Sequence, residues 1–338
     1  MNSIFNYTFD KFSLYLVENG FKKYNAQQIF QWIYKKKVYD FNMMTNLSKE
    51  LINFLVNNLS TKMLLVLKED KTSLTSKYLL QVNDDTIECV LMKQNYGNSL
   101  CVSSQVGCNM SCAFCESGRL KKVRNLLTSE MILQILTIEN INNIKIDNIV
   151  IMGIGEPFDN YDNVVDFINI LIDSKAVTIS QRKITVSTCG IVPKIILFAN
   201  LRNQVNLAVS LHAPNDEIRN KLMPINKVYN VKTLFNCIDN YIEITNRRVT
   251  IEYILIDGVN DSEECAWELS SLVKNKLMYV NLIPYNTTSS FTFKRSKDFK
   301  IKKFYDILKM NKIEVIIRKE MGLKKSAACG QLRANSKE

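Results

Sequence analysis

The sequence predicts an α/β fold built around a parallel sheet, arranged either as an open sheet or as a full or partial barrel. Strand-like runs occur after residue 96, at 148–152, 183–188, 205–211, 249–256, 279–283 and 313–317. Helical stretches separate them, at 128–140, 162–173, 231–245, 262–275 and 297–311. Strands that alternate with helices in this way are typical of βα units, whose strands run parallel.

The residues before this pattern predict two further parts. Ile29, Trp32 and Ile33 recur at helical spacing, and Ser48 opens the run SKELINFLVNNL as a helix N-cap. The stretch that follows changes to three short runs, LLVLKED, KYLLQV and TIECVLM, which predict a small β-meander. We therefore expect a helical accessory domain at 1–60, a linking β-meander at 61–95 and a βα core at 96–338.

The net charge of +11 is unevenly distributed along the chain. Residues 1–77 carry 11 basic and 6 acidic side chains, residues 291–338 carry 14 and 5, and the middle carries 19 and 22. Basic ends favour a polyanionic partner such as nucleic acid, although AT-biased coding would also enrich a chain in Lys, Asn and Ile.

The expected location is the cytoplasm. No apolar run approaches the ~20 residues of a membrane span, and the N-terminus lacks the basic-then-apolar pattern of a secretory signal. In the cytoplasm the nine cysteines would be reduced thiols, metal ligands or catalytic groups rather than structural disulfides.

Polar loops follow four of the predicted strands. GIGEPFDN comes after 148–152, STCG ends the next strand, SLHAP ends the third, and PYN follows 279–283. Turn formation alone explains any one such loop, because Gly, Pro, Ser and Asn are common turn residues. Since the carboxyl ends of parallel strands meet at one mouth, the four loops together predict a functional site there.

A further loop carries the segment CVSSQVGCNMSCAFCESG. Cys108, Cys112 and Cys115 have the spacing C-x3-C-x2-C, and the only histidine of the chain is His212. A structural zinc site needs four Cys or His ligands, whereas iron–sulfur clusters are held by closely spaced thiolates. We expect an iron–sulfur cluster, with zinc or three inert thiols as the alternatives. Three thiolates on a four-iron cluster leave one iron open to a substrate or cofactor.

This cysteine spacing, with Phe114 before the last cysteine, resembles the radical S-adenosylmethionine (radical SAM) superfamily. The resemblance implies a partial (βα)6 barrel of the TIM type and one [4Fe-4S] cluster on the three cysteines. It also implies that S-adenosylmethionine (SAM) binds the open iron and yields a 5′-deoxyadenosyl radical on reduction. GIGEP resembles the second motif of the superfamily, so Gly155 and Glu156 would contact the methionine amine of the cofactor.

Collinear blocks from about residue 20 to residue 333 narrow the resemblance. They are QIFQWIYKKKVYDFNMMTNLSKEL, CVSSQVGC, RNLLTSEM, GIGEPFDNYDNV, STCGIVPK, SLHAPND, KLMPIN and AACGQL. In this order they resemble the bacterial radical SAM adenine-C2 methyltransferases of 23S ribosomal RNA and tRNA. That family implies both RNAs as partners. From the basic charge of the N-terminal part we expect RNA binding by the helical domain at 1–60, and we expect a flavodoxin- or ferredoxin-like electron donor. We expect a monomer without membrane contact.

The functional positions of that family carry over motif by motif. Glu88 in IECVLM matches a proton acceptor, Cys101 in LCVSSQ a resolving cysteine, and Cys329 in AACGQL the cysteine that carries the methyl group. Cofactor contacts match Ser187 in VSTCG, Ser210, Leu211 and His212 in SLH, and Asn286 in PYN. The remaining cysteines are expected to be small core residues: Cys89, Cys189, Cys237 and Cys265.

The implied chemistry explains why two extra thiols are present. Adenine C2 is electron-poor and cannot attack a sulfonium methyl group, so a radical route is needed. Two SAM molecules would be consumed per methylation, one to methylate Cys329 and one to form the radical. Glu88 would then remove the C2 proton, and Cys101 would release the RNA through a transient disulfide.

Two other functions compete with this interpretation. One is a C8 adenine methyltransferase of the antibiotic-resistance type, although Pro157 after Gly-Glu and Val106 before Gly107 look more like the C2 family. The other is a non-catalytic iron–sulfur or zinc RNA-binding protein, which would have no use for Cys101, Cys329 or the cofactor loops.

Overall fold

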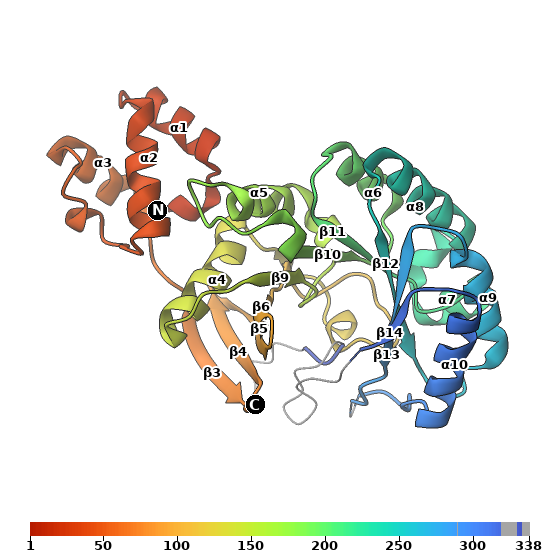
Figure 1. Cartoon of the computed structure of the whole chain (residues 1–338). Coiled ribbons are helices and arrows are strands. Elements are labelled where there is room, and N and C mark those ends of the chain that lie inside the picture. Colours follow the sequence, from red (N-terminus) through yellow and green to blue (C-terminus); the bar gives the residue numbers. More distant parts are fainter. Residues whose placement is uncertain (289, 319–329, 333–338) are drawn as a thin grey trace.

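The computed structural model describes residues 1–288, 290–318 and 330–332 (Figure 1). The N-terminal helices, drawn in red, form a lobe beside a larger body of strands and helices. No helix within the described residues combines the length and the apolar composition that crossing a membrane would require.

Three helices make up most of the N-terminal lobe: α1 (Phe9–Glu18), α2 (Lys23–Phe30) and α3 (Lys49–Asn58). The predicted N-cap of α3 is confirmed, because Ser48 Oγ accepts a hydrogen bond from Leu51 N at 3.2 Å. A π-helical turn, η2 (Gln31–Lys35), continues α2. Ile29 and Ile33 are fully buried, whereas Trp32 is only half-buried.

Lysine side chains of the lobe form ion pairs and hydrogen bonds with the body. Lys37 Nζ lies 3.1 Å from Glu139 Oε2, and Lys35 Nζ donates a hydrogen bond to Ala176 O at 2.7 Å. Lys11 forms an ion pair with Asp166. Part of the positive charge in the first sixty residues therefore serves packing within the protein and not a partner.

Ten strands of the body form one sheet in the order β14-β13-β12-β11-β10-β9-β6-β5-β4-β3, and β7 (Gln105–Val106) and β8 (Arg124–Asn125) form a separate antiparallel pair. The predicted meander is present as antiparallel β3 (Leu65–Lys71), β4 (Thr75–Val82) and β5 (Asp85–Gln94). β5 pairs directly with β6 (Gly97–Cys101), where the parallel part begins. The other parallel strands are β9 (Asn148–Ile151), β10 (Ile184–Thr188), β11 (Asn206–Ser210), β12 (Val249–Leu255), β13 (Met278–Pro284) and β14 (Val315–Ile317).

Helices cover the outer face of these parallel strands (Figure 1). They are α4 (Thr128–Asn142), α5 (Tyr161–Ile172), α6 (Val192–Asn200), α7 (Asp216–Leu222), α8 (Val231–Thr245), α9 (Glu263–Val273) and α10 (Asp298–Met310). The prediction of a partial (βα)6 barrel is confirmed, and β14 follows the sixth βα unit. β14 and β3 stand at opposite ends of the sheet order, so the described sheet does not close.

The sequence pattern missed two helices, α6 and α7. α6 contains the apolar run IILF, which by itself favours a strand as much as a helix. Pro193 in its first turn is tolerated because the first N–H groups of a helix have no internal partner. α7 has only seven residues and is mostly polar, so it lacks a recognisable apolar stripe.

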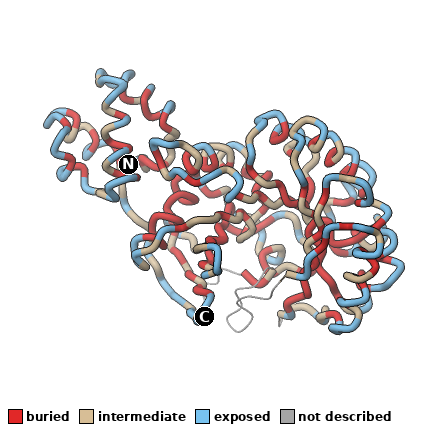
Figure 2. Tube along the Cα trace, viewed as in Figure 1, coloured by how far each residue is buried: buried red, intermediate tan, exposed pale blue. Residues whose placement is uncertain are grey.

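The sheet separates an apolar outer layer from a more polar interior. On β10, Ile184 and Val186 are fully buried in the main core, whereas Thr185 and Ser187 line cavities inside the barrel. Figure 2 shows buried segments along the strands and along the inward sides of the helices. Because side chains alternate along a strand, the same residues hold the helices outside and present polar groups inside.

One buried amide fixes α4 to the start of the cysteine loop. Gln134 is 0% exposed; its Oε1 accepts a hydrogen bond from Ser103 N at 2.9 Å, and its Nε2 donates one to Ser103 O at 3.0 Å. The amide therefore satisfies both backbone groups of Ser103, just after β6 ends.

Gln134→Met should lower the free energy of unfolding by about 2–4 kcal/mol, because each buried polar group left unsatisfied costs about 1–3 kcal/mol. Urea unfolding under anaerobic conditions measures this change. Asn140→Met, at an exposed position of the same helix, is the matched control and should change stability by less than about 0.5 kcal/mol. A loss no larger than that of the control would contradict the proposed anchoring.

Candidate active site

Two loops meet at the carboxyl end of the barrel strands, 102–105 after β6 and 153–156 after β9. Gly153 N donates a hydrogen bond to Val102 O at 3.0 Å, and Ser104 N donates one to Ile154 O at 2.9 Å. Glu156 N donates to the side-chain Oε1 of Gln105 at 2.9 Å. These bonds hold the start of the cysteine loop beside the GIGEP motif, as the prediction of parallel strands required.

Both glycines of GIGEP are needed for this close approach. A Cβ on Gly153 would lie 2.6 Å from Ser103 Oγ and 2.8 Å from the carbonyl carbon of Val102. A Cβ on Gly155 would lie 2.6 Å from Gln105 Cβ, and the φ of Gly155 is +105°, which L side chains rarely adopt. Any larger residue at either position would separate the two loops.

A cavity of about 160 Å³ lies at this mouth. Its lining includes eight of the predicted site residues: Cys108, Cys112, Cys115, Gly155, Glu156, Ser187, Ser210 and His212. Its other lining residues include Cys189, Glu252 and Arg318, which were not predicted to belong to a site. Cys189 is a buried residue, as expected, but it also faces this cavity.

The three loop cysteines fit an iron–sulfur cluster by type and by placement. Burial raises the pKa of Cys108 to about 12, and burial together with the neighbouring thiols raises that of Cys112 well above its usual value. Both are therefore neutral thiols until a metal displaces the proton. Within the described residues no three His, Cys, Asp or Glu side chains are set to hold a single ion. A four-iron cluster does not require such convergence, because each thiolate binds a different iron.

The carboxylate of Glu156 links two of the loops. It is buried, and its Oε1 accepts a hydrogen bond from Phe158 N at 3.0 Å while Oε2 accepts one from Cys189 N at 2.8 Å. Burial raises the pKa of this carboxyl group, and the hydrogen bonds act in the opposite direction. The side chain therefore joins the loop after β9 to the loop after β10.

His212 lines the cavity, and two contacts hold its ring. Its Nδ1 accepts a hydrogen bond from Ile254 N at 3.1 Å, and its ring meets Phe114 edge to face at a centroid distance of 4.9 Å. Burial and then the charge of Arg219 lower the pKa of His212 to about 3. The imidazole is therefore neutral near pH 7, and because Nδ1 is the acceptor, the proton resides on Nε2.

A fully buried arginine holds the ends of two strands in place. Arg219 Nη2 donates to Cys189 O at 2.8 Å, and Nε donates to Leu211 O at 3.1 Å. Leu211 N donates to Glu252 O at 3.1 Å, and the Leu211 side chain is 0% exposed. Leu211, predicted to contact the cofactor, lines neither of the two cavities described here and has both backbone groups engaged.

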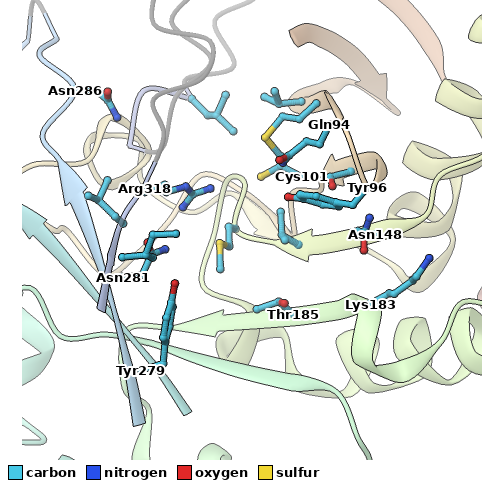
Figure 3. A pocket seen from close by; sticks show the side chains of 18 of the residues that line it. Gln94, Tyr96, Cys101, Asn148, Lys183, Thr185, Tyr279, Asn281, Asn286 and Arg318 are labelled. Carbon is cyan, nitrogen blue, oxygen red and sulfur yellow. The ribbon is translucent and has the colours of Figure 1, made fainter. Parts of the chain in front are cut away.

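A second cavity of about 520 Å³ lies inside the barrel (Figure 3). Met152, Ile283 and Arg318 line both cavities, so the two spaces adjoin. Figure 3 shows Cys101 and Tyr96 on one side of this space and Asn281, Tyr279 and Arg318 on the other. The predicted residues Cys101 and Asn286 thus line the larger cavity and not the smaller one.

Glu88 lies on the same inner face as Cys101. Cys101 pairs with Val90 across β6 and β5, and Glu88 precedes Val90 by two residues. In such a ladder the diagonal neighbours on one face are about 7–8 Å apart between Cα atoms. Glu88 is 4% exposed, and its Oε1 lies 2.9 Å from Lys77 Nζ. The structure therefore brings the predicted base close to the predicted resolving thiol.

The described residues of the last sequence block contact both the cysteine loop and Cys101. Gly330 O accepts a hydrogen bond from Glu116 N at 2.9 Å, and Leu332 O accepts one from Ser117 Oγ at 2.8 Å. Leu332 packs in one apolar cluster with Cys101, Val90 and Ile154. Cys329 itself lies outside the described residues.

Polar residues inside the strands also line the cavities, and the sequence reasoning, which considered only strand ends, missed them. Asn281 Nδ2 donates a hydrogen bond to Glu252 Oε2 at 2.9 Å, and burial raises the pKa of Glu252 against the opposing charge of Arg318. Glu252 and Asn281 each interrupt an apolar strand run, in VTIEYILI and YVNLI. A search for polar residues at period two would have found them.

His212→Asn keeps a residue that tolerates the positive φ of +58° and removes the titrating ring. The pKa of about 3 lies below the usual 6.5, so the unfolded chain binds the proton first as pH falls. Stability should therefore rise with pH between these values. From about pH 7.5 to pH 5.5 the wild type should lose ~1.4 kcal/mol more unfolding free energy than the variant. Urea titration at each pH measures this, and equal losses would contradict a neutral buried histidine.

Known proteins resemble this chain over nearly its whole length. Residues 102–266 match the radical SAM superfamily, and residues 2–60 match the ribosomal RNA large subunit methyltransferase N-terminal domain. A protein from Spiroplasma citri is 52% identical and covers 99% of this chain and 98% of its own length. One from Malacoplasma penetrans is 51% identical and covers 98% and 96%. Both are described as "Probable dual-specificity RNA methyltransferase RlmN".

A solved structure agrees with these relatives. The crystal structure of a radical SAM methyltransferase from Sphaerobacter thermophilus superimposes with a TM-score of 0.93 at 40% identity. The match covers 99% of this chain and 100% of that chain. Identity at this level, across both the N-terminal lobe and the barrel, is far more specific than a shared fold. The chain therefore belongs to the RlmN family of radical SAM RNA methyltransferases.

Proposed function

We propose that the protein methylates C2 of adenine in 23S ribosomal RNA and in tRNA, through a methyl group carried by Cys329 and released by Cys101. The observation that supports this route best is the wall of the larger cavity. There Cys101 packs with Leu332, which follows Cys329 by only three residues. A thiol outside the cluster ligands, at this position, suits the resolution of a covalent intermediate.

The smaller cavity supports binding of the cluster and of SAM. Cys108, Cys112 and Cys115 would hold one [4Fe-4S] cluster. The polar groups for SAM would come from Gly155, Glu156, Ser187, Ser210 and His212 in this cavity and from Asn286 in the adjoining one, while Leu211 would support the position of Ser210 and His212 from the core. When bound, these groups supply the 5′-deoxyadenosyl radical after one-electron reduction by a flavodoxin- or ferredoxin-like donor. The neutral His212 would offer Nε2–H as a donor, and Phe114 and Met223 would exclude water.

Cys329, Glu88 and Cys101 each carry out a different step of the proposed reaction on RNA. The sulfur of Cys329 accepts a methyl group by displacement from one of two SAM molecules. Once that carbon is joined to C2, Glu88 accepts the C2 proton. Cys101 then attacks the sulfur of Cys329, so that an S–S bond forms as the S–C bond breaks and the carbon takes up a proton. The unpaired electron of the adduct is lost before this step, and the cluster, oxidised by one electron when SAM is cleaved, would accept it. An external thiol reductant later reopens the disulfide.

A basic and aromatic surface on α2 and its continuation supports RNA binding. Tyr24 is 57% exposed, Lys36 Nζ lies 3.5 Å from the centre of the Trp32 ring, and Lys22 and Lys23 are exposed nearby. Lysines bind phosphates through charge, and aromatic rings stack on unpaired bases. Unlike Lys11, Lys35 and Lys37, these lysines are not used in attaching the lobe to the body.

Cys329→Ala should keep its cluster but give neither methylated protein nor modified RNA. Cys101→Ala should accept the methyl group, couple to adenine and then stall, because no second thiol attacks the Cys329 sulfur. The expected product is RNA attached covalently to protein, seen as a denaturation-resistant band that ribonuclease shortens. Cys237→Ala, a buried thiol away from both cavities, is the control and should behave as wild type. Normal RNA methylation by Cys101→Ala would end the proposed pairing of the two thiols.

Replacing Lys22, Lys23 and Lys36 together by Gln should weaken RNA binding and flatten its salt dependence. Each lost phosphate contact reduces the slope of log affinity against log salt by about 0.7–0.9, so the combined change is about 2 to 3. Titrations of RNA binding at several salt concentrations measure this slope. The matching triple Arg variant should keep it, and an unchanged slope in the Gln variant would assign RNA binding to another surface.

A further inference from the structure

Three neighbouring strands place a cation, a carboxylate and a thiol on one inner face. Lys77 pairs with Val90, and Glu88 pairs with Leu79, across β4 and β5. Val90 in turn pairs with Cys101 on β6. Directly paired residues share a face, and side chains two residues apart do so as well. Lys77 on β4, Glu88 on β5 and Cys101 on β6 therefore follow one another across the sheet, on the face that is directed toward the interior.

The ion pair between Lys77 and Glu88 is largely enclosed by the protein. Lys77 Nζ lies 2.9 Å from Glu88 Oε1, and the two side chains are 14% and 6% exposed. Most other ion pairs in the described residues include at least one side chain that is more than a fifth exposed, as in Lys37–Glu139 or Lys122–Asp159. A pair this enclosed is little screened by solvent, so its two charges interact more strongly than those of an exposed pair.

We propose that Lys77 is a positioning residue that keeps Glu88 ionised and oriented for removal of the adenine C2 proton. Burial alone favours the neutral form of a carboxyl group, whereas an adjacent ammonium group favours the charged form. A neutral carboxylic acid has no capacity to accept the proton in this step. Lys77 therefore favours the ionised form of Glu88, which is the form that can accept a proton. This inference rests on the proposed function, in which Glu88 is the proton acceptor.

The proton transfer is balanced without another reactant. The C2–H bond breaks, its electron pair stays in the purine ring system, and the proton forms an O–H bond on Glu88. The Glu88 carboxylate thus becomes neutral while Lys77 remains an ammonium ion. The proton later returns to solvent, which restores the ion pair for the next turnover.

The test compares Lys77→Met, Lys77→Arg and Glu88→Gln in the cluster-loaded protein. Lys77→Met and Glu88→Gln should both still cleave SAM and methylate the carrier cysteine, but should release methylated RNA about 10²-fold more slowly, the effect typical of a lost general base. Both should accumulate the covalent RNA–protein adduct. Lys77→Arg keeps a cation and should restore most of the release rate. Lys93→Met, at an exposed position on β5, is the matched control and should behave as wild type.

Deuterium at adenine C2 distinguishes this role from a merely structural one. Lys77→Met should show a primary isotope effect on RNA release that the Lys93→Met control does not show, because only the base step breaks the C2–H bond. The double variant Lys77→Met/Glu88→Gln removes both charges of this ion pair and should release RNA as slowly as Glu88→Gln alone. This comparison remains informative if Lys77→Met alone loads its cluster poorly.

Different outcomes test the role of Lys77 and the role of Glu88 as the base. If Glu88→Gln forms an adduct but Lys77→Met releases RNA at the control rate without an isotope effect, the role of Lys77 is overturned while the proposed function stands. A double variant clearly slower than Glu88→Gln would also overturn it, since Lys77 would then act in another step. If Glu88→Gln itself releases RNA normally, the base assignment in the proposed function fails and the inference fails with it.

Discussion

The hydrogen bonds of Ser103 are the constraint on which the rest of the site depends. Its hydroxyl donates to Glu88 O at 2.6 Å and accepts from Ile154 N at 2.9 Å, and its N–H and C=O are both bound by Gln134. One small side chain and its backbone therefore join β5, the end of β6, α4 and the loop after β9. Because β5 carries Glu88, β6 carries Cys101 and the loop carries GIGEP, the relative positions of all three are set together.

The interior of the barrel contains charged side chains, and each of those described here lies beside a charged or polar partner. Lys77 compensates Glu88, and Asn281 and Arg318 act on Glu252. Such buried groups interact more strongly than they would in water, so a loss of one partner is costly. The larger cavity, about 520 Å³ in volume, adjoins the smaller one that carries the cysteines. In the proposed function, radical formation and attack on the base would therefore take place in adjoining spaces.

Hydrophobic periodicity and capping residues correctly predicted most of the helices and strands, because these depend on interactions between residues close in sequence. The alternation of strands and helices after residue 96 and the N-cap at Ser48 are both confirmed. The cysteine loop and the GIGEP motif were expected at one mouth because parallel strands end together, and they line one cavity there. α6 was missed because its apolar run has no clear period, and tertiary packing on α8 decides its conformation.

The register between neighbouring strands cannot be predicted from the local sequence of either strand. Much of the site depends on that register. That Lys77 faces Glu88, and that Glu88 is diagonal to Cys101, follows from the pairing of β4 with β5 and of β5 with β6. A shift of one residue in either pairing would turn Glu88 away from Cys101. Likewise, no sequence pattern indicates that Arg219 would bind the carbonyl groups of Cys189 and Leu211. Such contacts join segments whose proximity only the folded chain defines.

The central claim is that the cavity directs a methyl group to C2 of adenine in RNA. The most direct measurement incubates anaerobically reconstituted protein with SAM, a reductant and naked ribosomal RNA, followed by nucleoside mass spectrometry against authentic standards. The account predicts 2-methyladenosine, and its formation should stop when Cys329 is replaced by Ala. Formation of 8-methyladenosine instead, or of 2-methyladenosine by Cys329→Ala at an undiminished rate, would contradict it.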